Sequence, residues 1–149
     1  MHTHLRRGLG AIGVAGLLLA CQSMGEDSAL FAFTFPDRER QEDFQVRLVS
    51  PQAIALARAE LQLPLGERHW YPWGRVRRGP SGRDNPNWNW HLEEVELVAT
   101  PAGDCDGDAT LVEENLDHWV ERVQWFCPSG AVVARDLSVP PQHGQAPHR

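Results

Sequence analysis

The stretch that decides the fold is FQVRLVSPQAIALAR, residues 44–58. Its first six residues, 44–49, alternate apolar with polar side chains, which predicts a half-buried β-strand. Ser50 and Pro51 then indicate a helix start, because serine caps free amides and proline is favoured in the first helical turn. The apolar residues that follow recur with the period of a helix, which Pro64 ends.

Further strand patterns lie on both sides of this stretch. An aromatic-rich run at 30–35 predicts a strand that forms a hairpin with 44–49. A second helix is predicted to start at Thr110, where Thr110 and Glu113 fit a capping box. Its apolar side is predicted to consist of Leu111, Val112, Leu116 and Trp119. The remaining strands are predicted at 74–79, 94–100, 123–127 and 131–137.

The order of these elements is ββα, β, βα, ββ. Runs of neighbouring strands favour antiparallel pairing, and the two helices need an apolar surface to cover. The sequence therefore predicts an α+β fold, a small and mostly antiparallel sheet with two helices packed on it.

The three cysteines predict both an export signal and a disulfide. Residues 1–20 combine a basic start with an apolar run that is too short to span a bilayer, which takes about 20 residues. The Leu-Leu-Ala sequence before Cys21 resembles the lipobox of bacterial lipoproteins, so we expect cleavage before Cys21 and its lipidation. The alternative is an ordinary signal cleaved elsewhere. Cys105 and Cys127 remain as a pair suited to one disulfide in an oxidising compartment.

These features divide the chain into a lipoprotein signal peptide (1–20), a tether (21–28), one folded domain (29–137) and a disordered tail (138–149). The chain has 20 acidic and 14 basic residues and a net charge of −6, which argues against nucleic acid as a partner. We expect the membrane to be contacted through lipid on Cys21. Because Gln22 rather than aspartate follows that cysteine, we expect the outer membrane of the bacterial cell envelope, with the domain facing periplasm or surface.

Several short motifs together are typical of one family. They are Phe31-Ala32-Phe33, the run 49–58, NPNWNWHL at 85–92, Cys105-Asp106, the run 112–117 and Phe126-Cys127-Pro128. With them the chain resembles, over residues 29–137, the family named for the N-terminal domain of a cAMP-inducible, calmodulin-binding protein. The resemblance implies the α+β domain and its disulfide. It implies no activity for this chain, since calmodulin binding was attached to one founding protein.

The segment 67–91 is rich in tryptophan and arginine and is interrupted by glycine and proline. Flat rings beside arginines in such a segment suit a sugar, an aromatic ligand or a partner peptide. The alternative is that the rings fill the core of a small domain, with the histidine bonded to backbone. The predicted ligand-binding residues are Trp73, Arg77, Trp88, Trp90 and His91.

An acidic run before the second helix resembles the start of a calcium loop. It places the carboxylates of Asp104, Asp106 and Asp108 at alternate positions. Ala109 and Asn115 stand where an EF-hand needs glycine and a bidentate glutamate. The alternative is an acidic turn at a helix N-terminus, where negative charge is favoured.

No motif in the sequence predicts a catalytic residue or a cofactor. There is no G-x-S-x-G elbow, no H-E-x-x-H and no C-x-x-C. We therefore expect an exported, lipid-anchored module that binds an envelope protein or a small molecule. The alternative is a small envelope hydrolase with an acidic site built from Glu113, Asp106 and His91.

Overall fold

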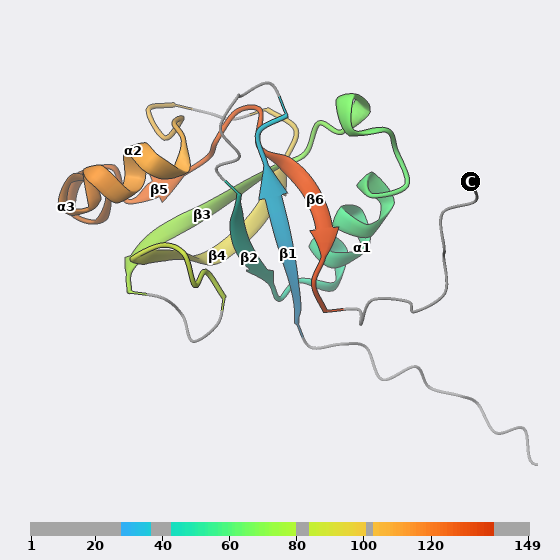
Figure 1. Ribbon diagram of the computed structural model, residues 1–149, viewed down its shortest axis with the longest axis horizontal. Helices are drawn as coiled ribbons and strands as arrows, with labels where there is room; N and C mark the ends of the chain where they lie inside the picture. The colour runs from blue at the N-terminus through green and yellow to red at the C-terminus, as the bar shows by residue number, and fades with distance from the viewer. Residues whose placement is uncertain (1–27, 37–42, 80–83, 101–102, 139–149) are drawn as a thin grey trace, which may run out of the picture.

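The computed structural model describes residues 28–36, 43–79, 84–100 and 103–138, which form two small sheets with helices at opposite ends (Figure 1). The predicted signal peptide, Cys21, most of the hairpin turn and all but the first residue of the predicted tail lie outside these ranges. Within them, no helix has the length and apolar character needed to cross a membrane.

The first sheet has the strand order β2-β1-β6, and both pairs are antiparallel. Its strands are β1 (Ala29–Thr34), β2 (Phe44–Leu48) and β6 (Val132–Asp136). The pairing of β1 with β2 confirms the predicted hairpin, and it places Phe33 opposite Phe44. The alternation that predicted β2 is also observed, since its apolar residues are buried and its polar ones are partly exposed.

The second sheet has the order β4-β3-β5 and is also antiparallel. Its strands are β3 (Tyr71–Arg78), β4 (Trp90–Val98) and the short β5 (Trp125–Phe126). The predicted α+β class with antiparallel pairing is thus confirmed, but the strands form two sheets rather than one. Both β3 and β4 begin earlier than the predicted 74–79 and 94–100.

A local irregularity explains why the start of β4 is hard to predict. Glu93 and Glu94 are both exposed, and Glu94 has a φ of 53°, so the alternation shifts between them. Across the pair, the register also shifts between Trp73 and Arg75. A Cβ added to Gly74 would lie 2.9 Å from the Val95 side chain, so only glycine lets the two strands approach this closely.

Helix α1 (Pro51–Glu60) follows β2 as the sequence predicts. The Ser50 hydroxyl accepts a hydrogen bond from the Ala53 amide at 3.4 Å, so the predicted N-cap is confirmed. At the other end of the helix, the buried Glu60 carboxylate accepts a 2.7 Å hydrogen bond from the His69 amide. This bond fixes the chain just before it enters β3.

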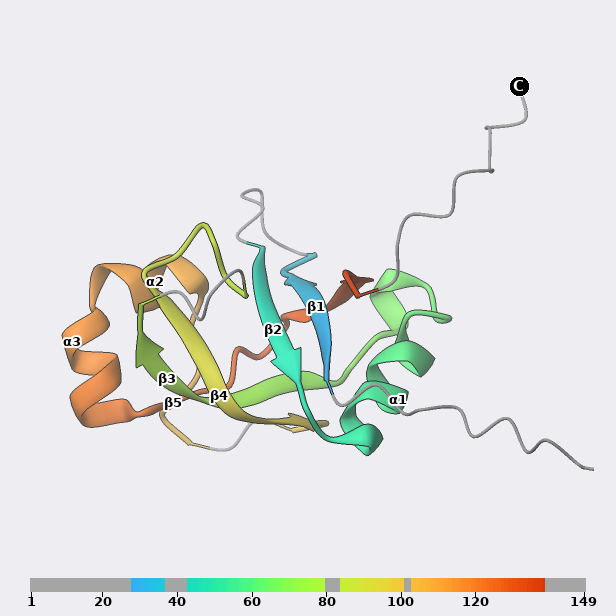
Figure 2. The ribbon, with the colours of Figure 1, turned by 90° about the horizontal axis from the view of Figure 1, so that it is seen from below.

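The core is an aromatic cluster that joins the two sheets, which lie face to face in Figure 2. Phe44 of the first sheet lies 5.8 Å from Phe33, 5.8 Å from Trp90 and 5.7 Å from Phe126 between ring centroids. Phe126 also meets Trp119 edge to face at 5.5 Å. Such pairs add to the free energy of burying the rings.

The second helical region starts differently from the prediction. Helix α2 (Ala109–Glu114) is capped by Asp108, whose carboxylate accepts from the Leu111 amide at 2.7 Å. The predicted cap, Thr110, lies inside the helix instead, so the capping-box prediction is wrong. Leu111 is 42% exposed, and its assignment to the apolar side of the helix is therefore also wrong.

Helical structure then continues beyond the predicted end. A short α3 (Leu116–His118) leads into the π-helical turn η2 (Trp119–Val123), which is closed by a 2.6 Å hydrogen bond from the Gln124 amide to the Trp119 carbonyl. Gln124 has a φ of 67° and turns the chain back into β5. The strand predicted to begin at Val123 therefore begins two residues later.

Candidate functional site

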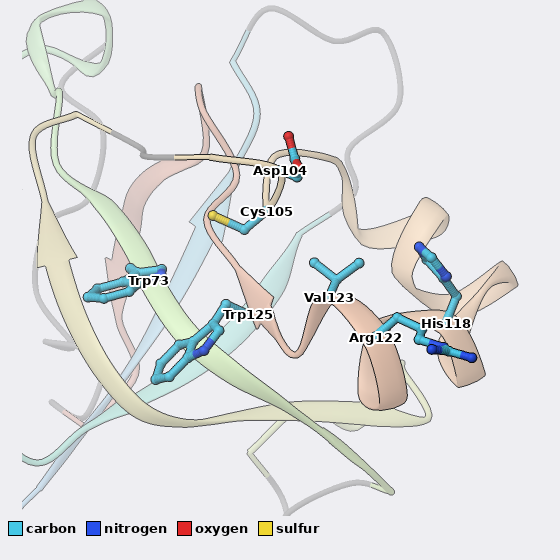
Figure 3. A pocket seen from close by; sticks show the side chains of 7 residues that line it. All are labelled: Trp73, Asp104, Cys105, His118, Arg122, Val123 and Trp125. Carbon is cyan, nitrogen blue, oxygen red and sulfur yellow. The ribbon is translucent and has the colours of Figure 1, made fainter.

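The best candidate site is an open hollow of about 520 Å³ between the second sheet and the helices at one end of the molecule (Figure 3). We call it the tryptophan hollow. It is lined by Trp73, Asp104, Cys105, His118, Arg122, Val123 and Trp125. These residues come from strands, helices and the disulfide segment, so the folded domain is needed to bring them together.

The alternation of the strands places two tryptophans on the outer face of the second sheet. In β3 the neighbours of Trp73, Pro72 and Gly74, are buried, and in β5 Phe126 points into the core. Trp73 and Trp125 are therefore directed outward together, with ring centroids 5.0 Å apart and planes 32° apart. Both rings remain partly exposed, and Figure 3 shows them side by side.

Arginine 75 holds one of these rings in place. Its guanidinium lies 5.2 Å from the centre of the Trp125 ring, which is within the range of a cation–π interaction. Arg75 and Trp125 are also directly paired residues of β3 and β5. Trp125 is thus fixed by Trp73 and Arg75 in the absence of a ligand.

The opposite wall of the tryptophan hollow is polar and cationic. It is made by His118 at the end of α3 and by Arg122 and Val123 of η2. The sharp turn at Gln124 brings this wall next to Trp125. Among the described residues, no hydrogen bond or ion pair engages the Arg122 guanidinium. An exposed arginine beside two exposed rings favours a ligand that carries both a flat apolar surface and a negative or acceptor group.

The third wall is held by the Cys105–Cys127 disulfide, which confirms the predicted pairing. The two Cα atoms are 5.2 Å apart, a usual separation for a disulfide. The Cys127 amide also donates to the Cys105 carbonyl at 2.8 Å. Asp106 adds a second clamp, because its carboxylate accepts from the Ser129 amide and hydroxyl, each at 2.7 Å.

The acidic run does not form a shared ligand set in the structure. The Asp106 carboxylate is bonded to Ser129, and that of Asp108 caps α2. Asp104 lies apart from these two bonds, at the rim of the tryptophan hollow. The described ranges contain no group of three or more histidine, cysteine or acidic residues placed to hold one metal ion.

Two of the predicted ligand-binding tryptophans lie elsewhere. The Trp90 ring is fully buried between Phe44 and Phe126, so it has no surface with which to contact a ligand. Trp88 is partly buried, and its indole N–H donates to the Asp43 carbonyl at 3.0 Å. Of the predicted aromatic residues, Trp73 alone lines the tryptophan hollow.

The predicted residues Arg77 and His91 lie on the outer face of the second sheet, outside the tryptophan hollow. They are paired across β3 and β4. Arg77 donates to the Glu93 carboxylate at 2.9 Å. The His91 Nδ1 lies 2.6 Å from the Gly79 carbonyl, which it can reach only as a donor, and its Nε2 lies 3.4 Å from Glu93. This cluster ties the end of the β3–β4 hairpin.

The hydrogen bond from Arg77 lowers the pKa of Glu93, against the opposing effect of desolvation, and His91 lowers it further. A carboxyl group with a lowered pKa stabilises the folded state above its unfolded pKa, and this contribution is lost as the pH falls through the folded value. We expect Arg77→Gln to raise the Glu93 pKa toward its ordinary value, as measured by NMR titration of the side-chain carboxyl carbon. An unchanged titration would show that Arg77 does not control this carboxylate.

The three residues of the alternative hydrolase site are not assembled by the structure. Glu113 accepts hydrogen bonds from the backbone and side chain of Asn89. Asp106 is bonded to Ser129, and His91 to the Gly79 carbonyl. Each group is thus engaged with a different neighbour.

Sequence reasoning missed Trp125, Arg122 and His118 as site residues. The adjacent Trp125 and Phe126 carried a usable signal, because neighbouring residues of a strand point to opposite faces and one ring must face outward. Nothing local predicts that Arg122 and His118 end up beside it, since that depends on the π-turn and on Gln124.

Comparison with known proteins gives one match. The model of the family named for the N-terminal domain of the cAMP-inducible, calmodulin-binding protein, which the sequence motifs indicate, matches residues 27–140. No curated protein and no solved structure matches the chain. The match covers all of the described strands and helices, including the tryptophan hollow.

Proposed function

This chain belongs to the family of that N-terminal domain, and from that premise we propose that it is a lipid-anchored binding module of the bacterial cell envelope. The match concerns a domain and assigns no activity to it, so the proposal rests on the chain's own residues. Its ligand-binding site is the tryptophan hollow. Its partner is a small molecule or an envelope component that presents a ring.

The sequence supports the location. A basic start, an apolar run and the Leu-Leu-Ala sequence before Cys21 match the order of a bacterial lipoprotein signal. The Cys105–Cys127 disulfide agrees with export, because disulfides persist in oxidising compartments. Gln22 after the lipidated cysteine favours transfer to the outer membrane.

Lipidation has a direct readout. In protein extracted from bacterial membranes, we expect residues 1–20 to be absent and the peptide that begins with Cys21 to carry the mass of its acyl chains. Mass spectrometry of the N-terminal peptide measures both. A Cys21→Ser variant serves as the control and should remain unprocessed. A wild-type N-terminus at another residue, with a free Cys21 thiol, would contradict the anchor.

One observation carries the binding function, namely the pair of outward-facing rings of Trp73 and Trp125 in an open hollow. Tryptophans on a sheet surface normally pack into a core or an interface, because each ring offers a large apolar area. Here they are preorganised by Arg75 and lie next to an arginine without a carboxylate partner among the described residues. Such a preformed aromatic concavity with a few polar groups is typical of ligand sites.

Replacement of Trp125 with alanine should abolish most of the binding. We expect a ligand found in a thermal-shift screen of the full chain to bind Trp125→Ala at least about tenfold more weakly, equivalent to about 1.4 kcal/mol. Isothermal titration calorimetry measures the difference. Trp70→Ala is the matched control, since Trp70 is also partly exposed but does not line the hollow. Equal losses in both variants, or none in either, would contradict this site.

A further inference from the structure

We propose that the tryptophan hollow recognises a carboxylated sugar, and this inference rests on the proposed binding function. Such a ligand combines a ring with apolar C–H faces, a negative charge and several hydroxyl groups. The hollow offers one partner for each of these features: two tryptophan rings, the Arg122 guanidinium and the Asp104 carboxylate.

The negative charge of the ligand follows from comparison of Arg122 with the other arginines. Arg47, Arg58, Arg77 and Arg78 each have a carboxylate partner within the protein. Arg122 is exposed in the wall of the hollow, and the described residues provide no such partner for it. A guanidinium that is left open in a chain with an excess of acidic residues is suited to bind a carboxylate of the ligand through paired N–H donors.

The rings provide the apolar contact. Trp73 and Trp125 are directed into the hollow from adjacent strands, and their planes are 32° apart. Because the rings are held before binding, a ligand that packs on them loses little protein side-chain entropy. A sugar ring has a C–H face that can lie against indole while its polar groups point outward to the rim.

Asp104 separates a sugar from other anionic rings. Its exposed carboxylate lies at the rim and, within the described ranges, has no hydrogen-bond or ion-pair partner. A carboxylate accepts hydrogen bonds from hydroxyl groups, but it repels a second anionic group such as a phosphate. A ligand with one carboxylate and several hydroxyls satisfies both Asp104 and Arg122. A benzoate-like acid has no hydroxyl for Asp104, and a nucleotide adds negative charge beside it.

The test uses the full chain purified in mild detergent and a matched pair of probes, trigalacturonic acid and its fully methyl-esterified form. The two differ in charge and keep the same rings and hydroxyls. We expect the acid to bind at least about tenfold more tightly in calorimetry, and to weaken as salt is raised. Arg122→Gln should bring the two affinities together, and Asp104→Asn should weaken both probes.

Arg135→Gln is the matched control, because Arg135 is an exposed arginine of β6 outside the hollow. It should keep the wild-type preference for the acid. Equal binding of acid and ester by the wild-type protein, with both dependent on Trp125, would overturn the carboxylate preference and leave the binding function standing. Binding of neither sugar, with another ring ligand that depends on Trp125, would overturn the sugar class alone. If no ring ligand depends on Trp125, both proposals are wrong.

Discussion

Replacement of Trp90 with alanine should destabilise the domain by about 3–5 kcal/mol, the usual cost of emptying a large aromatic site. The ring is fully buried, and its centroid lies 5.8 Å from Phe44 of the first sheet and 5.5 Å from Phe126 of the second. It therefore fills the space where the two sheets meet. A domain of this size has a total stability of about 5–15 kcal/mol, so the loss would leave it marginal.

Urea denaturation of wild type and variant, followed by circular dichroism, measures this loss. A Trp90→Phe variant gives a finer test. The Trp90 indole N–H is buried and has no hydrogen-bond partner in the described part of the chain, so phenylalanine removes an unsatisfied donor as well as volume. We expect it to lose less than about 2 kcal/mol. Trp70→Ala should change little, and a Trp90→Ala loss as small as that of Trp70→Ala would refute the core assignment.

The elements that the sequence predicts correctly are those set by local chemistry. The strand at β2 alternates cleanly because one of its faces is buried against Phe33 and its neighbours. Helix α1 begins at Ser50 because a capping hydroxyl and a first-turn proline act within four residues of each other. Both signals can be seen without knowing what the segment packs against.

The helix cap at α2 shows how two local signals compete. Thr110 and Glu113 match a capping box, but Asp108 lies two residues earlier and is the better cap. Residue 108 also follows the Cys105–Cys127 bond and the Asp106–Ser129 bonds, which fix where the chain can turn into the helix. The choice is made by long-range contacts, and the sequence pattern contains only the alternatives.

The candidate site depends even more on long-range structure. Trp73 was predicted from its tryptophan-rich segment, whereas its partner Trp125 is 52 residues away in the numbering and meets it only through the pairing of β3 with β5. The wall with Arg122 depends on a non-glycine residue, Gln124, in the left-handed region. Such conformations are uncommon outside glycine, asparagine and aspartate, so a strand was predicted in its place.

Removal of the disulfide should be the second large effect. We expect the double variant Cys105→Ala, Cys127→Ala to lose about 3 kcal/mol, because the bond closes a loop with a sequence separation of 22 and so restricts the unfolded chain. The backbone bond between these residues and the Asp106–Ser129 bonds do not involve sulfur. They should hold the native arrangement once the domain is folded, so the fold should survive with lower stability.

Two measurements separate this entropic role from a role in shaping the site. Urea denaturation gives the loss of stability, and calorimetry with a ligand of the tryptophan hollow gives the affinity of the folded variant. Cys105 lines the hollow, but the rings of Trp73 and Trp125 are placed by β3 and β5. We therefore expect the affinity to change by less than about threefold, well below 1.4 kcal/mol. If stability is unchanged and binding is lost, the disulfide positions the site rather than stabilising the domain. Adding Asp106→Asn to the double variant should then remove the remaining clamp, and a further fall in stability would show that the carboxylate and the disulfide hold the same segment.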